Sequence, residues 1–98
     1  MSQFQLSLNA ERAIFAIADY TDSHFGQSQT EAYLVGLESS FELIGQFPEI
    51  GVAAFEIKQG LRRYHFQMHN IFYTQQDGFV LIENIIHTAC TIRQSLFS

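Results

Sequence analysis

Residues 60–87, GLRRYHFQMHNIFYTQQDGFVLIENIIH, predict three short strands joined by two tight turns. The aromatic and β-branched residues of this stretch are typical of strands. The strands are expected over 61–68, 71–74 and 79–87. His69-Asn70 marks the first turn, and Asp77-Gly78 gives the stronger hairpin signal at the second. Because the last strand is apolar on both faces, we expect helices to cover one face and the C-terminal tail or a partner to cover the other.

A strand and a first helix are predicted ahead of this sheet. Residues 4–8 alternate between apolar and polar side chains, as in a half-buried strand. Asn9 is expected to cap the helix that follows, in which apolar residues recur at helical spacing over 10–25. Gly26 is expected to end this helix, because glycine is common just past a helix C-terminus.

A second helix is predicted to begin at the capping box formed by Ser28 and Glu31. Pro48 ends it by residue 47, because the residue before a proline leaves the helical region. The two helices should form an antiparallel hairpin, since only about three residues separate them. Residues 53–57 are a candidate edge strand. The expected fold class is α+β, with an N-terminal strand, an antiparallel α-hairpin, a three- to four-stranded antiparallel sheet and a short C-terminal helix.

Length and charge restrict the kind of protein. The 98 residues are expected to form a single domain, 1–98, and a hydrophobic share of 47% suits one packed core. A net charge of −5 and a single lysine, Lys58, argue against a broad nucleic-acid surface, because neutralising phosphates requires many cations. The only cysteine, Cys90, excludes an internal disulfide and fits a cytoplasmic protein. We expect no signal peptide and no membrane span, since no apolar run approaches about 18 residues.

Arg62 and Arg63 stand at the start of a predicted strand, so their side chains should point to opposite faces. Two interpretations stay open, namely one salt bridge beside one solvated arginine, or an anion contact made by one of the two. Tyr73 should lie near Arg62 across a hairpin, and together with His69 the set could perform acid–base chemistry on RNA. The alternative is a core aromatic residue among surface polar groups.

Three histidines come from separate places that a sheet could bring together, namely His65, His69 and His87. A zinc site needs three or four well-placed ligands, and no carboxylate or cysteine lies at a matching spacing. The sequence therefore predicts no metal and no cofactor.

The outer faces of the two helices carry carboxylates together with single apolar residues. A solvated acidic face is the simple interpretation of Glu31, Glu38 and Glu42. Phe15 and Val35 lie off the apolar stripes, and isolated exposed apolar residues are normal. If they join an exposed sheet edge, they form a partner groove. The residues expected to contact such a partner are Phe15, Asp19, Asp22, Glu31, Val35, Glu38 and Glu42.

Residues 5–51, QLSLNAERAIFAIADYTDSHFGQSQTEAYLVGLESSFELIGQFPEIG, resemble the opening of ParE-type toxins of bacterial toxin–antitoxin pairs. That opening has an LSxxA-like helix start, then IxxYTxxxFG, QAxxYxxxL and a PxxG turn. The sheet is similar to the patterns GxRxxxxxxHxIFY and IxxxLH. The matching residues are Leu6-Ser7, Ala10, Ile17, Tyr20-Thr21, Phe25-Gly26, Gln29, Tyr33, Leu37, Pro48, Gly51, Gly60, Arg62, His69, Ile71-Phe72-Tyr73, Ile82 and His87. The resemblance runs from about residue 4 to residue 87.

The resemblance implies the fold of the RelE/ParE superfamily and a toxin that inhibits DNA gyrase by binding rather than as an enzyme. It also implies neutralisation by a ParD-like antitoxin, whose C-terminal segment wraps over helices and sheet in a hetero-oligomer. The target-contact candidates are Arg62, Arg63, His69, Tyr73, His87 and Arg93. The chain departs from the family at the positions of Asn84, Thr88 and Thr91. Family members often carry arginine at the position of Asn84 and other residues at the two threonines. We expect these changes to affect toxicity rather than fold.

Two alternatives remain beside gyrase inhibition. One is a RelE-like ribosome-dependent endoribonuclease, which would need several cations to hold RNA and to stabilise charge on the phosphorus. The few lysines and arginines of this chain favour gyrase inhibition instead. The other is an attenuated toxin that mainly forms the antitoxin complex.

Overall fold

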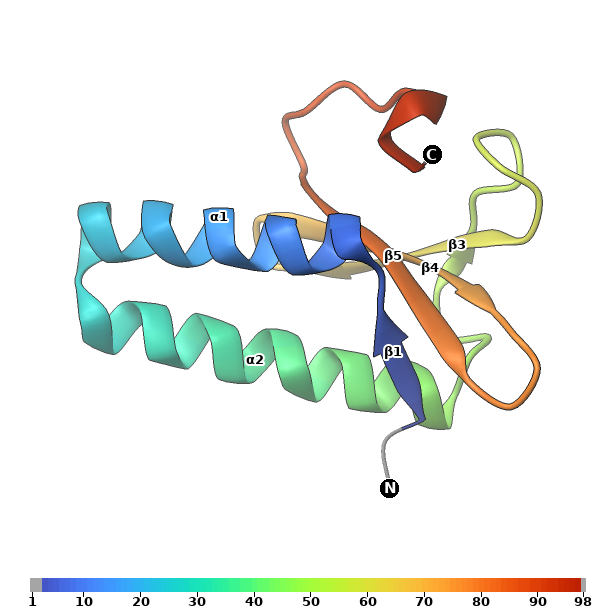
Figure 1. Cartoon of the computed structure of the whole chain (residues 1–98), viewed down its shortest axis with the longest axis horizontal. Coiled ribbons are helices and arrows are strands. Elements are labelled where there is room, and N and C mark those ends of the chain that lie inside the picture. Colours follow the sequence, from blue (N-terminus) through green and yellow to red (C-terminus); the bar gives the residue numbers. More distant parts are fainter. Residues whose placement is uncertain (1–2, 98) are drawn as a thin grey trace.

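Two antiparallel helices lie on one face of a five-stranded sheet in the computed structural model, which describes residues 3–97 (Figure 1). The elements are β1 (Phe4–Leu6), α1 (Leu8–Phe25), α2 (Gln27–Gln46), β2 (Val52–Ala53), β3 (Leu61–Phe66), β4 (His69–Gln75), β5 (Val80–His87) and the short 3-10 helix η1 (Gln94–Phe97). The strand order is β1-β5-β4-β3-β2. β1 runs parallel to β5, and the other neighbours are antiparallel. The predicted α+β class is confirmed, and the antiparallel sheet of three to four predicted strands consists of the four strands β2 to β5.

The caps of the helix hairpin differ from the predicted ones. Ser7 rather than Asn9 caps α1, because the Ser7 hydroxyl accepts the Ala10 N–H at 3.0 Å. A single residue, Gly26, links the helices, and its φ of 88° allows the abrupt reversal. The Gly26 carbonyl accepts both the N–H and the hydroxyl of Thr30, so α2 starts at Gln27 without the predicted capping box.

The sheet also shifts relative to the predicted boundaries. The β3–β4 turn falls at Gln67 and Met68 rather than at His69-Asn70, and Gln67 takes a positive φ of 50° there. The predicted edge strand over 53–57 is reduced to β2, because residues 55–57 turn away from the sheet. Between Phe72 and the next residue of β4, the pairing with β5 skips Glu83, which is the extra residue of a β-bulge.

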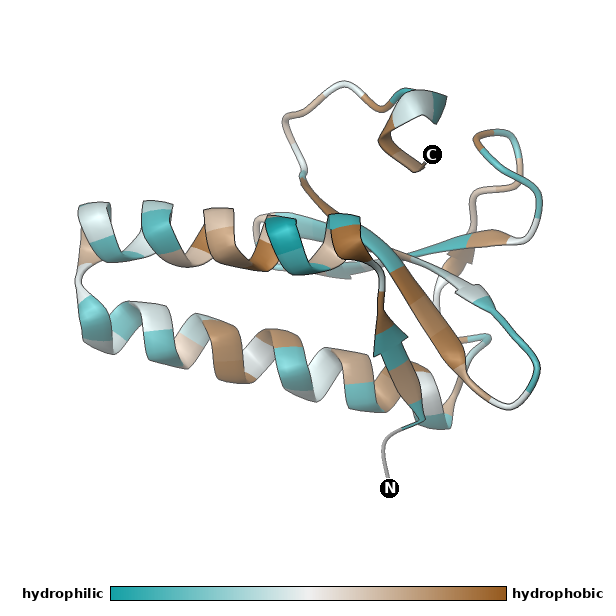
Figure 2. Cartoon of the chain, in the orientation of Figure 1, coloured by the Kyte–Doolittle hydropathy of each residue, from teal (hydrophilic) through white to brown (hydrophobic). Residues whose placement is uncertain are grey.

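Both faces of β5 are covered, as its apolar sequence predicts, and Figure 2 shows long hydrophobic stretches in this strand. On one face, Ile82 and Ile85 pack with residues of α1 and α2. On the other face, Ile86 packs with Phe72 and with Phe97 of the C-terminal tail. The tail therefore supplies the second cover that the sequence required. No helix of residues 3–97 has the length and apolarity to cross a membrane.

Candidate binding surfaces

A cleft of about 840 Å³ lies between the helix hairpin and the sheet, next to the β3–β4 turn. Its lining is mostly apolar and aromatic, and no aspartate, glutamate, lysine or arginine contributes to it. We call it the histidine cleft and define it by Tyr20, Phe25, Tyr33, Met68, His69 and His87. Tyr20 and Phe25 remain 60% and 63% exposed, so this end of the hairpin presents uncovered aromatic surface.

His69 and His87 form a pair in the cleft because they are direct partners in the β4–β5 register. Their rings meet edge to face with centroids 5.4 Å apart. The Tyr33 hydroxyl lies 2.6 Å from His69 Nδ1. Burial lowers the pKa of His69 and the nearby His87 adds to the effect, so the neutral ring is favoured. Burial likewise raises the pKa of Tyr33, against a smaller opposing effect of a backbone hydrogen bond with Met68.

A hydrogen bond from the backbone selects the tautomer of the neutral His87 ring. His87 Nδ1 accepts the Ala89 N–H at 3.0 Å, and His69 Nδ1 faces the Tyr33 hydroxyl. A neutral imidazole that accepts at Nδ1 carries its proton on Nε2. In its neutral form His87 therefore offers an Nε2–H donor, and the cleft suits an apolar ligand that presents an acceptor oxygen.

Tyr73 is a core aromatic residue, as the alternative interpretation of the sequence held, and its hydroxyl and Arg62 have structural roles that the sequence did not reveal. The fully buried Tyr73 hydroxyl donates to the Pro48 carbonyl at 2.7 Å and accepts the Gly51 N–H at 2.9 Å. Arg62 Nη1 donates to the Gly51 carbonyl at 2.8 Å, and its guanidinium lies over the Phe55 ring. Together they fasten the loop after α2 to the sheet. Burial raises the pKa of Tyr73, while the Gly51 hydrogen bond and Arg62 oppose the rise.

The predicted acid–base set is therefore not assembled on an accessible surface. Tyr73 has no exposed surface, and Arg62 is bonded to a backbone carbonyl. His69 lies four residues away along β4, a distance of about 13 Å at strand spacing. Arg62 and Arg63 do point to opposite faces, as predicted, since they pair with Tyr73 and Phe72 respectively. Of the two open interpretations, the one that includes a salt bridge is wrong, because the only ion pair within residues 3–97 involves Lys58.

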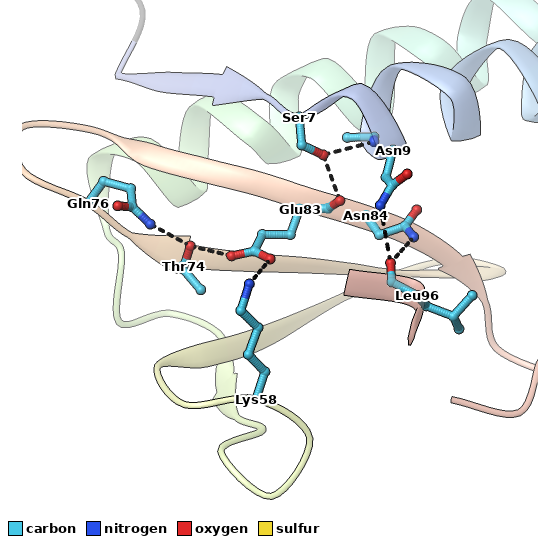
Figure 3. A network of polar contacts seen from close by, with 9 residues as sticks. Ser7, Asn9, Lys58, Thr74, Gln76, Glu83, Asn84 and Leu96 are labelled. Carbon is cyan, nitrogen blue, oxygen red and sulfur yellow. Dashed lines mark hydrogen bonds and ion pairs between the residues drawn. The ribbon is translucent and has the colours of Figure 1, made fainter. Parts of the chain in front are cut away.

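A polar network joins the bulge in β5 to the start of α1, to the loop before β3 and to the tail (Figure 3). The bulge places the side chains of Glu83 and Asn84 on the same face, although they are consecutive in a strand. The Glu83 carboxylate accepts from Lys58 Nζ at 2.6 Å and from the Thr74 hydroxyl at 2.7 Å. Asn84 Nδ2 donates to the Leu96 carbonyl at 2.8 Å, which holds η1 against the sheet.

Asn9 also belongs to this network, although not as the predicted helix cap. Its Nδ2 lies 3.5 Å from the Leu96 carbonyl, at the long end of hydrogen-bond range. The predicted tail helix exists only as η1, with Leu96 and Phe97 turned inward and Cys90 exposed.

The remaining predicted contact residues lie on two exposed surfaces. We call the first the outer helix surface. It comprises Phe15, Asp19 and Asp22 on α1 and Glu31, Val35, Glu38 and Glu42 on α2. Phe15 and Val35 are 73% and 66% exposed. On the far side of the sheet, Arg63 opposes Phe72 in register and Arg93 lies in the tail, and both are exposed. The six target-contact candidates are thus split between the cleft, the interior and the tail side.

No group of three or more histidine, cysteine, aspartate or glutamate side chains within residues 3–97 is placed to hold a metal ion. His65 pairs with Asn70 and so lies on the opposite face from His69 and His87. The absence of a metal stays a prediction, and stoichiometric zinc in protein purified without a histidine tag would contradict it.

Known proteins match this arrangement over nearly its whole length. Toxin ParE1 from two strains of Mycobacterium tuberculosis is 28% identical over 96 residues, which cover 97% of this chain and 98% of the relative. A solved structure described as the chromosomal ParDE TA system from P. aeruginosa superposes with a TM-score of 0.76. That match covers 89% of this chain and 96% of the other at 13% identity, and it shows the fold. The family model of the ParE toxin of type II toxin–antitoxin systems, parDE, matches residues 4–90, and the chain therefore belongs to the ParE toxin family.

Proposed function

We propose that this chain inhibits DNA gyrase by binding and that a ParD-like antitoxin neutralises it in the cytoplasm. The observation that carries the proposal is the ParE toxin match over residues 4–90. The fold of a ParDE system structure supports it, since the match covers almost all of both chains.

The arrangement of polar residues favours binding over catalysis. RNA cleavage requires an acid–base pair and cations that reach the substrate. In this chain Tyr73 is buried, Arg62 holds a backbone carbonyl and Lys58 holds Glu83. The exposed cations of the sheet and tail are Arg63 and Arg93. We therefore assign no catalytic residue and place the gyrase contact on the tail side, around these two arginines.

The charge distribution supports a separate antitoxin surface. Residues 8–46 hold six of the ten acidic residues and one of the five lysines and arginines, so the helix hairpin accounts for the whole net charge of −5. The exposed apolar residues of the outer helix surface and of the histidine cleft lie within or beside this acidic region. A basic, partly apolar segment of the antitoxin would bury these apolar residues. The negative charge of the helix hairpin would attract such a segment before contact.

Gyrase inhibition can be tested with purified chain in a DNA supercoiling assay, alongside a cell-free translation assay. We expect loss of supercoiling and normal translation. The Arg63→Ala/Arg93→Ala variant should inhibit more weakly, whereas Arg12→Ala, which removes an exposed cation from α1, should inhibit normally. Arrest of translation with supercoiling intact would refute the proposal and favour a RelE-like endoribonuclease instead.

The antitoxin can be tested by co-expressing the small reading frame that neighbours this chain's gene. We expect a stable complex and restored growth of the host cells. Phe15→Ala and Val35→Ala should weaken that complex, while Phe47→Ala, which removes a similarly exposed ring beyond α2, should not. Failure of the two proteins to associate would refute the antitoxin assignment.

A further inference from the structure

We propose that antitoxin binding over the histidine cleft requires His69 and His87 to be neutral, so that acidification releases the antitoxin. This inference rests on the proposed function and adds a mode of regulation to it. It is carried by the geometry of two imidazoles in ring contact, the half-buried His69 and the exposed His87, which line an apolar cleft beside the acidic helix hairpin.

The cleft offers nothing that would stabilise a second positive charge. The titratable groups that face the histidine pair are the phenol of Tyr20 from α1 and that of Tyr33 from α2. His24, which does not line the cleft, stacks on Tyr20 with ring centroids 4.0 Å apart. No carboxylate lines the cleft, so an occupant would leave two charged rings 5.4 Å apart and shielded from water. Burial of such a pair without a counter-ion is costly.

Protonation would also break the local hydrogen bonding. A charged imidazole carries a proton on both nitrogens. At His87 the added proton would face the Ala89 N–H that Nδ1 accepts in the neutral state. At His69 the charged ring carries a proton on Nδ1, which can then only donate to the Tyr33 hydroxyl. Acidification therefore disturbs the His87–Ala89 corner at the end of β5 as well as the charge in the cleft.

The occupant is inferred from charge complementarity. The helix hairpin that forms one wall of the cleft carries the entire net negative charge of the chain, so a segment attracted to it should be basic. A basic segment contains no counter-ion for a charged imidazole and makes its protonation more costly. An acidic segment would instead pair with charged histidines and tighten on acidification, which is the opposite outcome.

The sign of the effect follows from proton linkage. The complex binds fewer protons than the free chain, so affinity is full at high pH and falls as pH drops through the free-state pKa values. For a model imidazole, with a pKa of about 6.5, the requirement to stay neutral raises Kd about tenfold between about pH 7.5 and about pH 5.5. The lowered pKa of His69 moves its share of the effect to more acidic pH.

The test measures Kd of this chain for the protein encoded by its neighbouring small reading frame, from about pH 5.5 to about pH 8. We expect Kd to rise at least about tenfold towards the acidic end. His69→Asn and His87→Asn keep an acceptor near Nδ1 but cannot charge, so their double variant should flatten this dependence. His65→Asn, an exposed histidine on the opposite face, is the matched control and should leave it unchanged.

A second readout does not depend on the variants folding. Proton NMR titration of the four histidines, free and in complex, should give lower pKa values for His69 and His87 in the complex and leave His65 unshifted. A Kd that does not change with pH, or that falls on acidification, would overturn the inference while leaving the toxin–antitoxin pair intact. A complex that forms at no pH would instead refute the antitoxin assignment, and the inference with it.

Discussion

Loss of the Lys58 charge should destabilise the fold more than loss of the Glu83 charge, although the two groups form one ion pair. Lys58 Nζ reaches Glu83 Oε1 at 2.6 Å from the loop before β3, and the Thr74 hydroxyl donates to the other oxygen. Lys58→Met removes the charge and keeps the apolar stem, so the buried carboxylate loses its counter-ion. Glu83→Gln leaves an ammonium that can turn to water.

The exposures of the two side chains set the magnitude. Removing one partner of a fully buried ion pair costs about 3–5 kcal/mol, and an exposed pair contributes about 0–1 kcal/mol. The side chains of Lys58 and Glu83 are 43% and 8% exposed, so this pair lies between those limits. We expect Lys58→Met to lower the free energy of unfolding by about 2 kcal/mol and Glu83→Gln by about 1 kcal/mol. For a chain of this size, the lysine change corresponds to a fall in Tm of about 8–16 °C.

A double-mutant cycle measured by urea denaturation isolates the interaction. The double variant Lys58→Met/Glu83→Gln should be about as stable as Glu83→Gln alone, because no unpaired carboxylate remains. That gives a coupling energy of about 1–2 kcal/mol. Arg63→Met removes an exposed cation that forms no ion pair with any residue of 3–97, so it is the matched control and should change stability by less than about 0.5 kcal/mol. Strictly additive effects, or Glu83→Gln costing more than Lys58→Met, would refute the reasoning.

Three further substitutions test single contacts. Arg62→Ala should lower the free energy of unfolding by about 1–2 kcal/mol in urea denaturation, because it removes the hydrogen bond to Gly51. Arg63→Ala should lower it by less than about 0.5 kcal/mol, and equal effects of the two changes would contradict the assigned roles. Tyr73→Phe leaves the Gly51 N–H and the Pro48 carbonyl without their partner, so it should lower the free energy of unfolding by about 1–3 kcal/mol by the same method. An unchanged midpoint of urea denaturation would contradict this role of the hydroxyl. Phe97→Ala should free the tail and expose Phe72, which an increase in binding of an apolar fluorescent dye would detect; unchanged fluorescence would count against the tail as a cover.

The elements of the fold were predictable because each has a clear period in the sequence. The stripe of α2 contains Leu37, Phe41 and Ile44, and all three are buried. The apolar run of β5 has no polar face, and this predicted a cover on both sides, which α1, α2 and the C-terminal tail provide. Periodicity reports burial, so it finds helices and strands and the faces that they cover.

The caps and the bulge were not predictable from the same patterns. Ser7 and Asn9 are both acceptable cap residues for α1, and only the path of the chain from β1 selects Ser7. Strict alternation places Glu83 and Asn84 on opposite faces, but one extra residue in β5 puts both on the tail side. Glu83 is the one carboxylate in this apolar strand, and Lys58 is the one lysine of the chain. These two facts were the signal from which the Lys58–Glu83 ion pair could have been predicted.

The candidate sites were only partly predictable, because sequence separation hides contacts between layers. The pairing of His69 with His87 follows from the hairpin, yet Tyr33 reaches them from another layer at a separation of 36 residues from His69. Tyr73 and Arg62 were singled out for their chemistry, and the structure uses both to fasten a loop. A polar side chain in a strand can bind a ligand or form a hydrogen bond with the protein's own backbone. The spacing of residues in the sequence is the same in both cases, so it does not distinguish the two roles.

The distribution of charge gives the two proposed partners different sides of the molecule. The helix hairpin holds the whole net charge of −5, and the remaining residues balance four acidic groups against four cations. Lys58 and Arg62 are occupied internally, which leaves Arg63 and Arg93 for a target on the tail side. An antitoxin segment confined to the helix side would leave those two arginines uncovered. If the proposed function holds, neutralisation of gyrase inhibition would require either an antitoxin that extends around the sheet to the tail or a complex too bulky to dock. A short peptide that binds the histidine cleft without restoring supercoiling would separate attachment from neutralisation.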